Sequence, residues 1–221
     1  MNFSAEDQFA EVVDHYNFWR GIANGASGGT YDAPDGQGGR LYFRSNYSEK
    51  LKTWPEWAEF GDWGAWIIAP TSGGYFSVLS SLKHERESRR DEDIKVMFSK
   101  FSDAGKYIIM RIGDGVRVDL RLRTQFVKWD DGGLDSHILI EPADRDAVDF
   151  MNKECPTLKK GFAEQYLKRY TLQSDPSSYG FAFPEDQPRM EVLALSFEEL
   201  TTALLEDMPD SITSQVSNWR Q

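Results

Sequence analysis

The chain has 221 residues, a formal net charge of −11, 40% hydrophobic residues and 14% aromatic residues. This apolar content suits a single folded domain over residues 1–221 and excludes a disordered chain. The excess of acidic residues argues against a nucleic-acid partner, because contact with phosphates requires clustered lysine and arginine. It favours a basic protein partner, with solubility alone as the alternative reason for such a charge.

The expected compartment follows from three further observations. Cys155 is the only cysteine, so no intrachain disulfide can form and a reducing environment is expected. The acidic start "MNFSAEDQFAEVV" has no apolar region of the kind found in secretion signals. No apolar run approaches the roughly 20 residues that span a bilayer. We therefore expect a cytoplasmic protein without membrane contact.

The first predicted element is a helix that begins near Ser4, where Asp7 three positions later completes a capping-box pattern. Gly21 is its expected end. The apolar face of this helix consists of Phe9, Val12, Val13, Tyr16 and Trp19. The sequence then predicts a glycine-rich loop over residues 24–40 and a short strand over residues 40–45.

Strand and turn signals follow in the middle of the chain. Strands are expected over residues 65–69 and 75–82, joined by a turn at Gly73–Gly74. A charged connection over residues 83–93 comes next. Residues 94–98 after it fit either a strand or the entry to a helix.

A helix is predicted from Ser102, a candidate N-cap, to Gly113, a natural stop, although its β-branched run also allows a strand. Beyond it, residues 116–122 alternate between apolar and charged side chains. That alternation predicts a half-buried strand with one wet face.

The last third of the chain mixes both kinds of element. We expect strands over residues 137–142, 179–184 and 190–195, and helices over residues 146–152, 157–170 and 197–208. The final helix has a capping box, Ser196 with Glu199, and ends before Pro209. Because strands mostly follow strands through short turns, the predicted class is α+β, with a mainly antiparallel sheet and the N-terminal and C-terminal helices packed on it.

The sequence does not point to catalysis, a cofactor or a metal. The glycine-rich stretch lacks both nucleotide-binding spacings and precedes a strand rather than a helix. The three histidines, His15, His84 and His137, have no zinc spacing, and Cys155 has Glu154 beside it instead of a base. The adjacent acids Asp130–Asp131 and Glu198–Glu199 point apart and are interpreted as solvated charge. We therefore expect a protein that is not an enzyme.

Two segments could bind a partner. The glycine-rich stretch is either a mobile surface loop or an adaptable loop that enters a partner's cleft, and its candidate contact residues are Tyr31, Asp32, Asp35, Gly36, Gly38 and Gly39. The second segment is rich in tryptophan, which either packs in the core or forms an aromatic surface. Its tryptophans are Trp54, Trp57, Trp63 and Trp66, of which Trp54 and Trp57 join the candidate contacts.

Residues 73–117 also carry a resemblance to a known family. A strand over residues 75–79, the segment Arg86-Glu87-Ser88, a short second strand, a helix with Tyr107 and the exit Gly113 to Arg117 occur in this order. This order resembles the family of bacterial immunity proteins that includes the immunity factor of the tuberculosis necrotizing toxin, an NAD-degrading enzyme.

The resemblance implies a non-enzymatic cytoplasmic antitoxin that binds a cognate protein toxin one-to-one and occludes its active site, with an NAD glycohydrolase as the toxin. Asp32 and Asp35 would then pair with basic residues that otherwise hold the NAD pyrophosphate. Two alternatives stay open. One is a small-molecule or carbohydrate binder, or an enzyme, that uses the tryptophan-rich segment, and the other is an adaptor for a protein unrelated to toxins.

Overall fold

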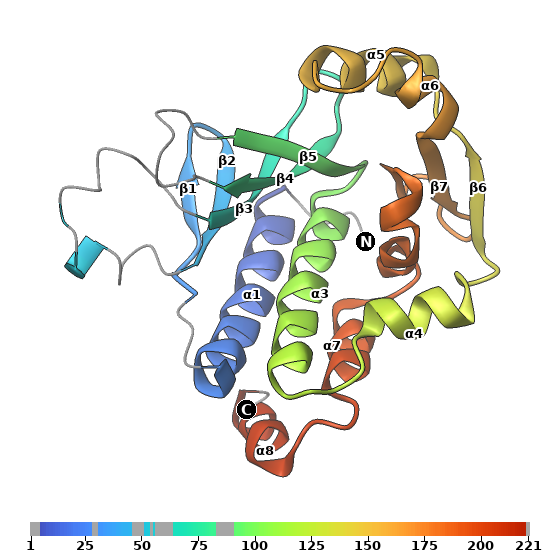
Figure 1. The fold of residues 1–221 in the computed structure, drawn as a ribbon. Helices are drawn as coiled ribbons and strands as arrows, with labels where there is room; N and C mark the ends of the chain where they lie inside the picture. Colours follow the sequence, from blue (N-terminus) through green and yellow to red (C-terminus); the bar gives the residue numbers. More distant parts are fainter. Residues whose placement is uncertain are drawn as a thin grey trace.

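The computed structural model describes residues 5–27, 31–45, 51–53, 55, 64–82 and 91–219 (Figure 1). In these residues one sheet of eight strands, every neighbouring pair antiparallel, has the order β1-β2-β3-β4-β5-β8-β7-β6. The strands are β1 (Asp35–Gln37), β2 (Arg40–Arg44), β3 (Gly64–Pro70), β4 (Phe76–Leu82), β5 (Asp91–Phe98), β6 (Ile138–Pro142), β7 (Lys168–Leu172) and β8 (Tyr179–Ala182). The predicted α+β class with a mainly antiparallel sheet is confirmed.

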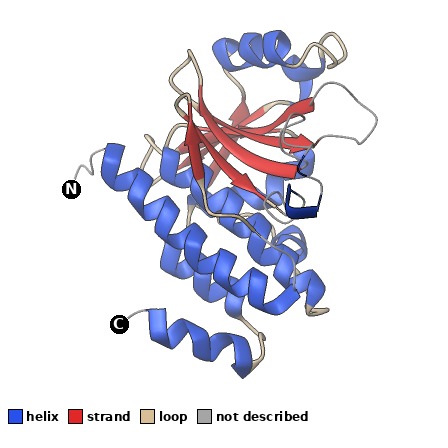
Figure 2. Ribbon diagram, turned by 90° about the vertical axis from the view of Figure 1, so that its left-hand side faces the viewer, coloured by secondary structure: helices blue, strands red, loops and turns tan. Residues whose placement is uncertain are grey.

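Helices lie on both sides of this sheet (Figure 2). They are α1 (Ala5–Ser27), α3 (Phe101–Asp119), α4 (Gln125–Gly132), α5 (Arg145–Glu154), α6 (Phe162–Tyr166), the 3-10 helix η2 (Pro184–Leu193), α7 (Phe197–Leu205) and α8 (Asp210–Trp219). Among the described helices, none has both the length and the apolar content that a bilayer crossing requires.

The main core lies between the sheet and the helices α1, α3, η2 and α7. Alternate side chains of the strands, such as Phe43, Val78 and Phe98, point into it and are almost fully buried. A second core covers part of the opposite face, where α5 and α6 pack on Met97 and Phe181. The sheet is therefore a middle layer, with its larger helical layer on one side.

Helices α1 and α3 run side by side (Figure 1) and approach closely because α3 has a glycine at the crossing. A Cβ atom on Gly105 would lie 2.4 Å from a γ-carbon of Val12, which is fully buried in α1. Gly113 has the same role against Leu204 of α7, at 2.6 Å. Two of the glycines in α3 are thus required by packing.

Helix α3 also carries polar side chains that are buried and bonded to segments far along the chain. Asp103 accepts a hydrogen bond of 2.7 Å from the hydroxyl of Ser178 and forms an ion pair of 2.9 Å with Lys106. Lys106 donates to the backbone carbonyl of Leu195 at 2.7 Å. Tyr107 donates to Asp186 of η2 at 2.9 Å. Apart from the ion pair within α3, each of these bonds ties a different segment of the C-terminal half to this helix.

The same arrangement continues at the C-terminal end of α3. Arg117 is fully buried and donates to the carbonyls of Leu204 and Glu206, where α7 ends, and to that of Arg123. A guanidinium suits the end of a helix because the last carbonyls have no partner within the helix. Asp114 accepts from the backbone N–H groups of Gln125 and Phe126 and so caps the start of α4. Burial raises the pKa of Asp114, although these two bonds and Arg117 oppose the rise.

The strand predicted over residues 116–122 is wrong, and so is the helix end predicted at Gly113. Helix α3 continues to Asp119, because its inner face needs Val116, which is 2% exposed, while Val118 is 61% exposed. The alternation of apolar and charged residues reflects this helical face combined with the buried Arg117. A charged residue can face inward when hydrogen bonds, here to three carbonyls, offset the cost of its burial.

Other boundaries differ from the prediction for local reasons. Helix α1 passes Gly21, which has open space around it, and ends at Ser27. Residues 190–195 are not a strand, since η2 extends to Leu193. The helix predicted over residues 157–170 is only the short α6, followed by β7, which the sheet recruits as a neighbour of β8. Residues 94–98 belong to a strand.

The two predicted loops, over residues 24–40 and 83–93, lie partly within helices and strands of the described residues. Residues 24–27 belong to α1 and residues 35–40 form a hairpin, so the glycine-rich stretch is largely regular structure. Residues 91–93 belong to β5, and residues 83–90 of the predicted charged connection lie outside the described residues. The capping box is as predicted, with Ser196 and Glu199 bonded reciprocally.

Candidate partner-binding surface

Four of the six candidate contacts of the glycine-rich stretch, Asp35, Gly36, Gly38 and Gly39, fall on the hairpin β1–β2 at one edge of the sheet. The turn between the strands is Gly38–Gly39, with φ of 58° and 79°. Two consecutive positive φ values define the mirror-image turn that suits the twist of a hairpin, and glycine adopts them without strain. Gly36, Gly38 and Gly39 are exposed, and a Cβ on any of them would meet nothing within 4 Å. The tip is therefore a thin edge of almost bare backbone.

Tyr31 and Asp32, by contrast, fasten the stretch to the body of the protein. Both backbone polar groups of Tyr31 are bonded to the side chain of Asn24 in α1, at 2.6 and 3.1 Å. Its half-buried ring packs against the main core, and this burial, with a smaller contribution from Asp119, raises the pKa of its hydroxyl. The carbonyl of Asp32 accepts from the hydroxyl of Tyr16 at 2.8 Å. Tyr31 is consequently a support of the hairpin more than an exposed anchor.

The hairpin is not a net acidic surface. Asp35 accepts from the guanidinium of Arg44 at 2.7 Å and from Gln37 at 2.9 Å. The guanidinium groups of Arg44 and Arg40 lie 4.7 and 5.4 Å from the ring centroid of Tyr42. The acid that was expected to attract basic residues of a partner is thus already paired within the hairpin.

The tryptophan-rich segment is described in part. Trp54, Trp57 and Trp63 lie outside the described residues. Trp66 of β3 packs against the main core, with its ring 6.2 Å from that of Tyr107 and with the guanidinium of Arg111 5.0 Å above it. Trp66 therefore takes the core-packing alternative.

Histidine and cysteine side chains are dispersed. His15 stacks on Phe197 of α7 at 4.4 Å, and burial lowers its pKa, although Glu198 opposes this. His137 is exposed at the start of β6 and His84 lies outside the described residues. Burial raises the pKa of the Cys155 thiol, which is the opposite of what a nucleophile requires. Among the described residues no group of histidine, cysteine and acidic side chains could hold a metal ion.

The adjacent acids are used locally. Asp131 forms an ion pair with Arg123, and Glu199 belongs to the capping box. These contacts account for one member of each pair without any acid–base chemistry.

The other edge of the sheet, strand β6, exposes apolar side chains that the sequence did not predict to be exposed. Strand β6 was predicted, but Leu139 and Ile140 are 46% and 47% exposed on it. An apolar segment such as "HILIEP" resembles a buried strand, and nothing in it indicates that the strand lies at an edge.

No protein-family model and no curated relative matches the sequence. Among solved structures the chain is similar to Rv3902c from M. tuberculosis, with a TM-score of 0.51 and 14% sequence identity over 93% of this chain and 90% of that chain. The resemblance suggested by residues 73–117 is thereby confirmed at the level of the fold.

Proposed function

We propose that the chain is a cytoplasmic immunity protein, which binds a cognate protein toxin one-to-one and blocks its active site without catalysing a reaction. The toxin that fits the proposal is an NAD glycohydrolase. The observation that carries it is the likeness to Rv3902c over nearly the whole chain, since that protein is associated with the tuberculosis necrotizing toxin. The negative charge of the chain supports rapid association with a basic partner.

The hairpin β1–β2 is the proposed inhibitory element. Its tip is narrow because the glycines lack side chains, and its base is held by Asn24 and Tyr16. An element that is already ordered loses less conformational entropy on binding than a free loop, for which each fixed residue costs roughly 1–2 kcal/mol. Such a tip can enter a substrate cleft and exclude NAD by volume, so its action does not depend on free carboxylates.

The proposal is tested by co-expression with the toxin domain encoded by the neighbouring reading frame. We expect the chain to restore growth, to co-purify with the toxin at equal stoichiometry and to stop NAD consumption by the purified toxin. Growth arrest despite soluble expression of both proteins would refute the proposal.

A second arm tests the hairpin. Gly36→Tyr adds bulk to the tip in open space, so it should weaken toxin binding at least roughly tenfold while the thermal midpoint stays the same. The matched control is Gly132→Tyr, also in open space but at the end of α4. Equal binding by both variants would assign the inhibitory role to another surface and leave the immunity function standing.

A further inference from the structure

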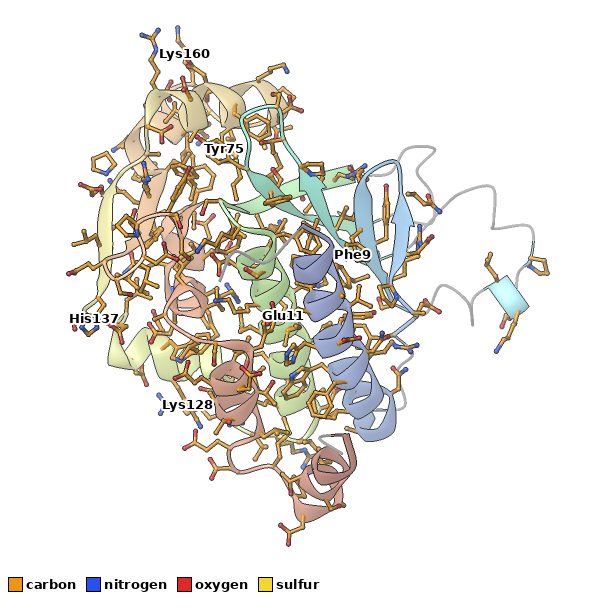
Figure 3. The ribbon with its side chains drawn as sticks, turned by 180° about the vertical axis from the view of Figure 1, so that it is seen from behind. Phe9, Glu11, Tyr75, Lys128, His137 and Lys160 are labelled. Atoms are coloured by element: carbon orange, nitrogen blue, oxygen red, sulfur yellow. The ribbon has the colours of Figure 1, made fainter. Side chains whose placement is uncertain are left out.

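Strand β6 ends the sheet on the side opposite to the hairpin. In the described residues it is paired along one side only, with β7, from Ile138 opposite Leu172 to Pro142 opposite Lys168. His137, which immediately precedes the strand, lies at the outer rim of the molecule (Figure 3). The second side of β6 is thus an open sheet edge.

The hydrogen-bond pattern identifies which backbone groups of β6 face outward. The carbonyl of His137 accepts from Gln173 at 2.8 Å and the N–H of Ala143 donates to Leu167 at 3.1 Å, so the odd-numbered residues face β7. Because bonding alternates along an antiparallel strand, the groups of residues 138, 140 and 142 point away.

Most of these outward groups are acceptors. The N–H of Ile138 is bonded to Asp135 at 2.9 Å and Pro142 has no N–H. What faces outward is therefore the N–H of Ile140 with the carbonyls of Ile138, Ile140 and Pro142. An incoming strand that donates to these carbonyls and accepts from Ile140 would complete the pattern.

The side chains of β6 leave apolar surface on both faces of this edge. Ile140 lies on the face of the sheet that carries the main core, in register with Tyr170, and Leu139 lies on the opposite face, in register with Thr171. Both are nearly half exposed, and among the large hydrophobic side chains of the described residues only Val118 is more exposed. Natural edge strands are usually protected by charged residues or proline, and β6 has these only at its end, as Glu141 and Pro142, while Ile138, Leu139 and Ile140 are apolar. The edge at β1, with Asp35 and Gln37, carries no such apolar pair.

The charge beside β6 selects the kind of segment that fits. Several acids in this region are already paired with bases, as Asp144 is with Arg169 and Asp149 with Arg145. Glu141 of β6 and Asp146 of α5 are exposed, and neither forms an ion pair with a described residue. The four acids Glu141, Asp144, Asp146 and Asp149 outnumber the three bases Arg145, Lys168 and Arg169, of which Arg169 and Lys168 lie opposite Glu141 and Pro142. The net charge at this edge is therefore negative, so the complementary segment is basic.

We propose that the open edge of β6 is a docking site for an extended segment of a protein partner, with alternating apolar and basic residues, which adds to the sheet as a further strand. Apolar residues of the segment would lie beside Ile140. Basic residues would lie beside Leu139 and Glu141 on the other face, with their aliphatic stems on Leu139 and their charges near Glu141. This inference stands independently of the toxin and of the hairpin.

The test uses the full chain and a short capped peptide of alternating valine and lysine, labelled for fluorescence anisotropy. We expect saturable binding and slower hydrogen exchange at the amide of Ile140. Ile140→Lys should weaken binding roughly tenfold or more, because it replaces apolar contact with like charge. Glu141→Gln should weaken it less and reduce its dependence on salt.

Two controls make the result specific. Val118→Lys changes an apolar residue that is 61% exposed on α3 and should bind the peptide as the unchanged chain does. A peptide of alternating valine and glutamate should not bind. Thermal melts of each variant establish that it is folded.

Three outcomes would overturn the inference. They are absence of saturable binding, equal weakening by Val118→Lys and Ile140→Lys, and unchanged exchange at Ile140 in the complex. Self-association of the unchanged chain that Ile140→Lys abolishes would assign the edge to a second copy and so also contradict it. None of these results bears on rescue from the toxin, so the proposed immunity function is tested separately.

Discussion

Helix α3 and the hairpin β1–β2 both carry charged side chains and glycines, but they use them in opposite ways. In α3 the charges are buried and bonded to segments about 75 to 89 residues away, as for Asp103 and Lys106. In the hairpin Asp35 pairs with its near neighbour Arg44 and Arg40 pairs with Glu92 of β5, and the acids of both pairs are partly exposed. The glycines of α3 admit another helix, whereas those of the hairpin form a turn. Substitutions in α3 should therefore change stability, and substitutions at the hairpin tip should change it little.

The largest effect is expected for Arg117→Met, which removes the donor to the carbonyls of Leu204, Glu206 and Arg123. The carbonyl of Leu204 then becomes unpaired in a buried site, and the other two become unpaired in partly buried sites, so the free energy of unfolding should fall by about 3 kcal/mol. Chemical denaturation measures the change. Arg145→Met is the matched control, because the side chain of Arg145 is 91% exposed and its loss should change the free energy by less than about 0.5 kcal/mol. Similar values for the two variants would contradict the role given to Arg117.

The second prediction compares the stability changes caused by alanine at two glycines of α3. Gly105→Ala forces Val12 to move and should lower the free energy of unfolding by about 2 kcal/mol, since overpacking outweighs the gain in helix propensity. Gly115→Ala meets only the hydroxyl of Tyr31, at 3.9 Å, and should raise stability by up to about 1 kcal/mol. Thermal and urea unfolding should each show a loss of stability for Gly105→Ala and a gain for Gly115→Ala. A loss of stability in both variants would show that the α1–α3 contact is not what requires glycine.

The smallest effect is expected at the hairpin. Gly39→Ala places a side chain at φ of 79° and should cost about 1 kcal/mol. Gly36→Ala, at an exposed position with open space, should change stability by less than about 0.5 kcal/mol. Urea unfolding of both variants gives the difference. A larger loss of stability for Gly36→Ala than for Gly39→Ala would contradict the importance given to the positive φ of Gly39 in the turn.

Local signals in the sequence predicted local structure well. The capping box at Ser196 and Glu199 needs only four consecutive residues, and it is present as predicted. The Gly38–Gly39 pair is a hairpin signal of the same kind, but the other glycines around it led to the prediction of a loop. The α+β class was also predictable, because it depends on the order of elements and not on their exact ends.

The predictions failed where the structure depends on contacts between residues that are far apart in the sequence. A buried arginine in α3 breaks the apolar pattern of a helix face, and only its bonds to Leu204 and Glu206 explain why it lies inside. The exposure of Leu139 and Ile140 depends on β6 lying at the end of the strand order, which its own residues do not encode. Of the candidate contacts, Tyr31 fitted an exposed anchor by residue type, and only the structure places its ring beside the core.

The long-range bonds of α3 have a consequence for how the chain folds during its synthesis. When α3 leaves the ribosome, the partners of Asp103, Tyr107 and Arg117 at Ser178, Asp186 and Leu204 have not yet been made. Until they emerge, burial of α3 would leave Asp103, Tyr107 and Arg117 without these hydrogen bonds, so the helix does not pack stably into the incomplete core. The final tertiary structure must therefore form late, once α7 has been synthesised. A nascent chain that stops before residue 178 should lack the native tertiary structure.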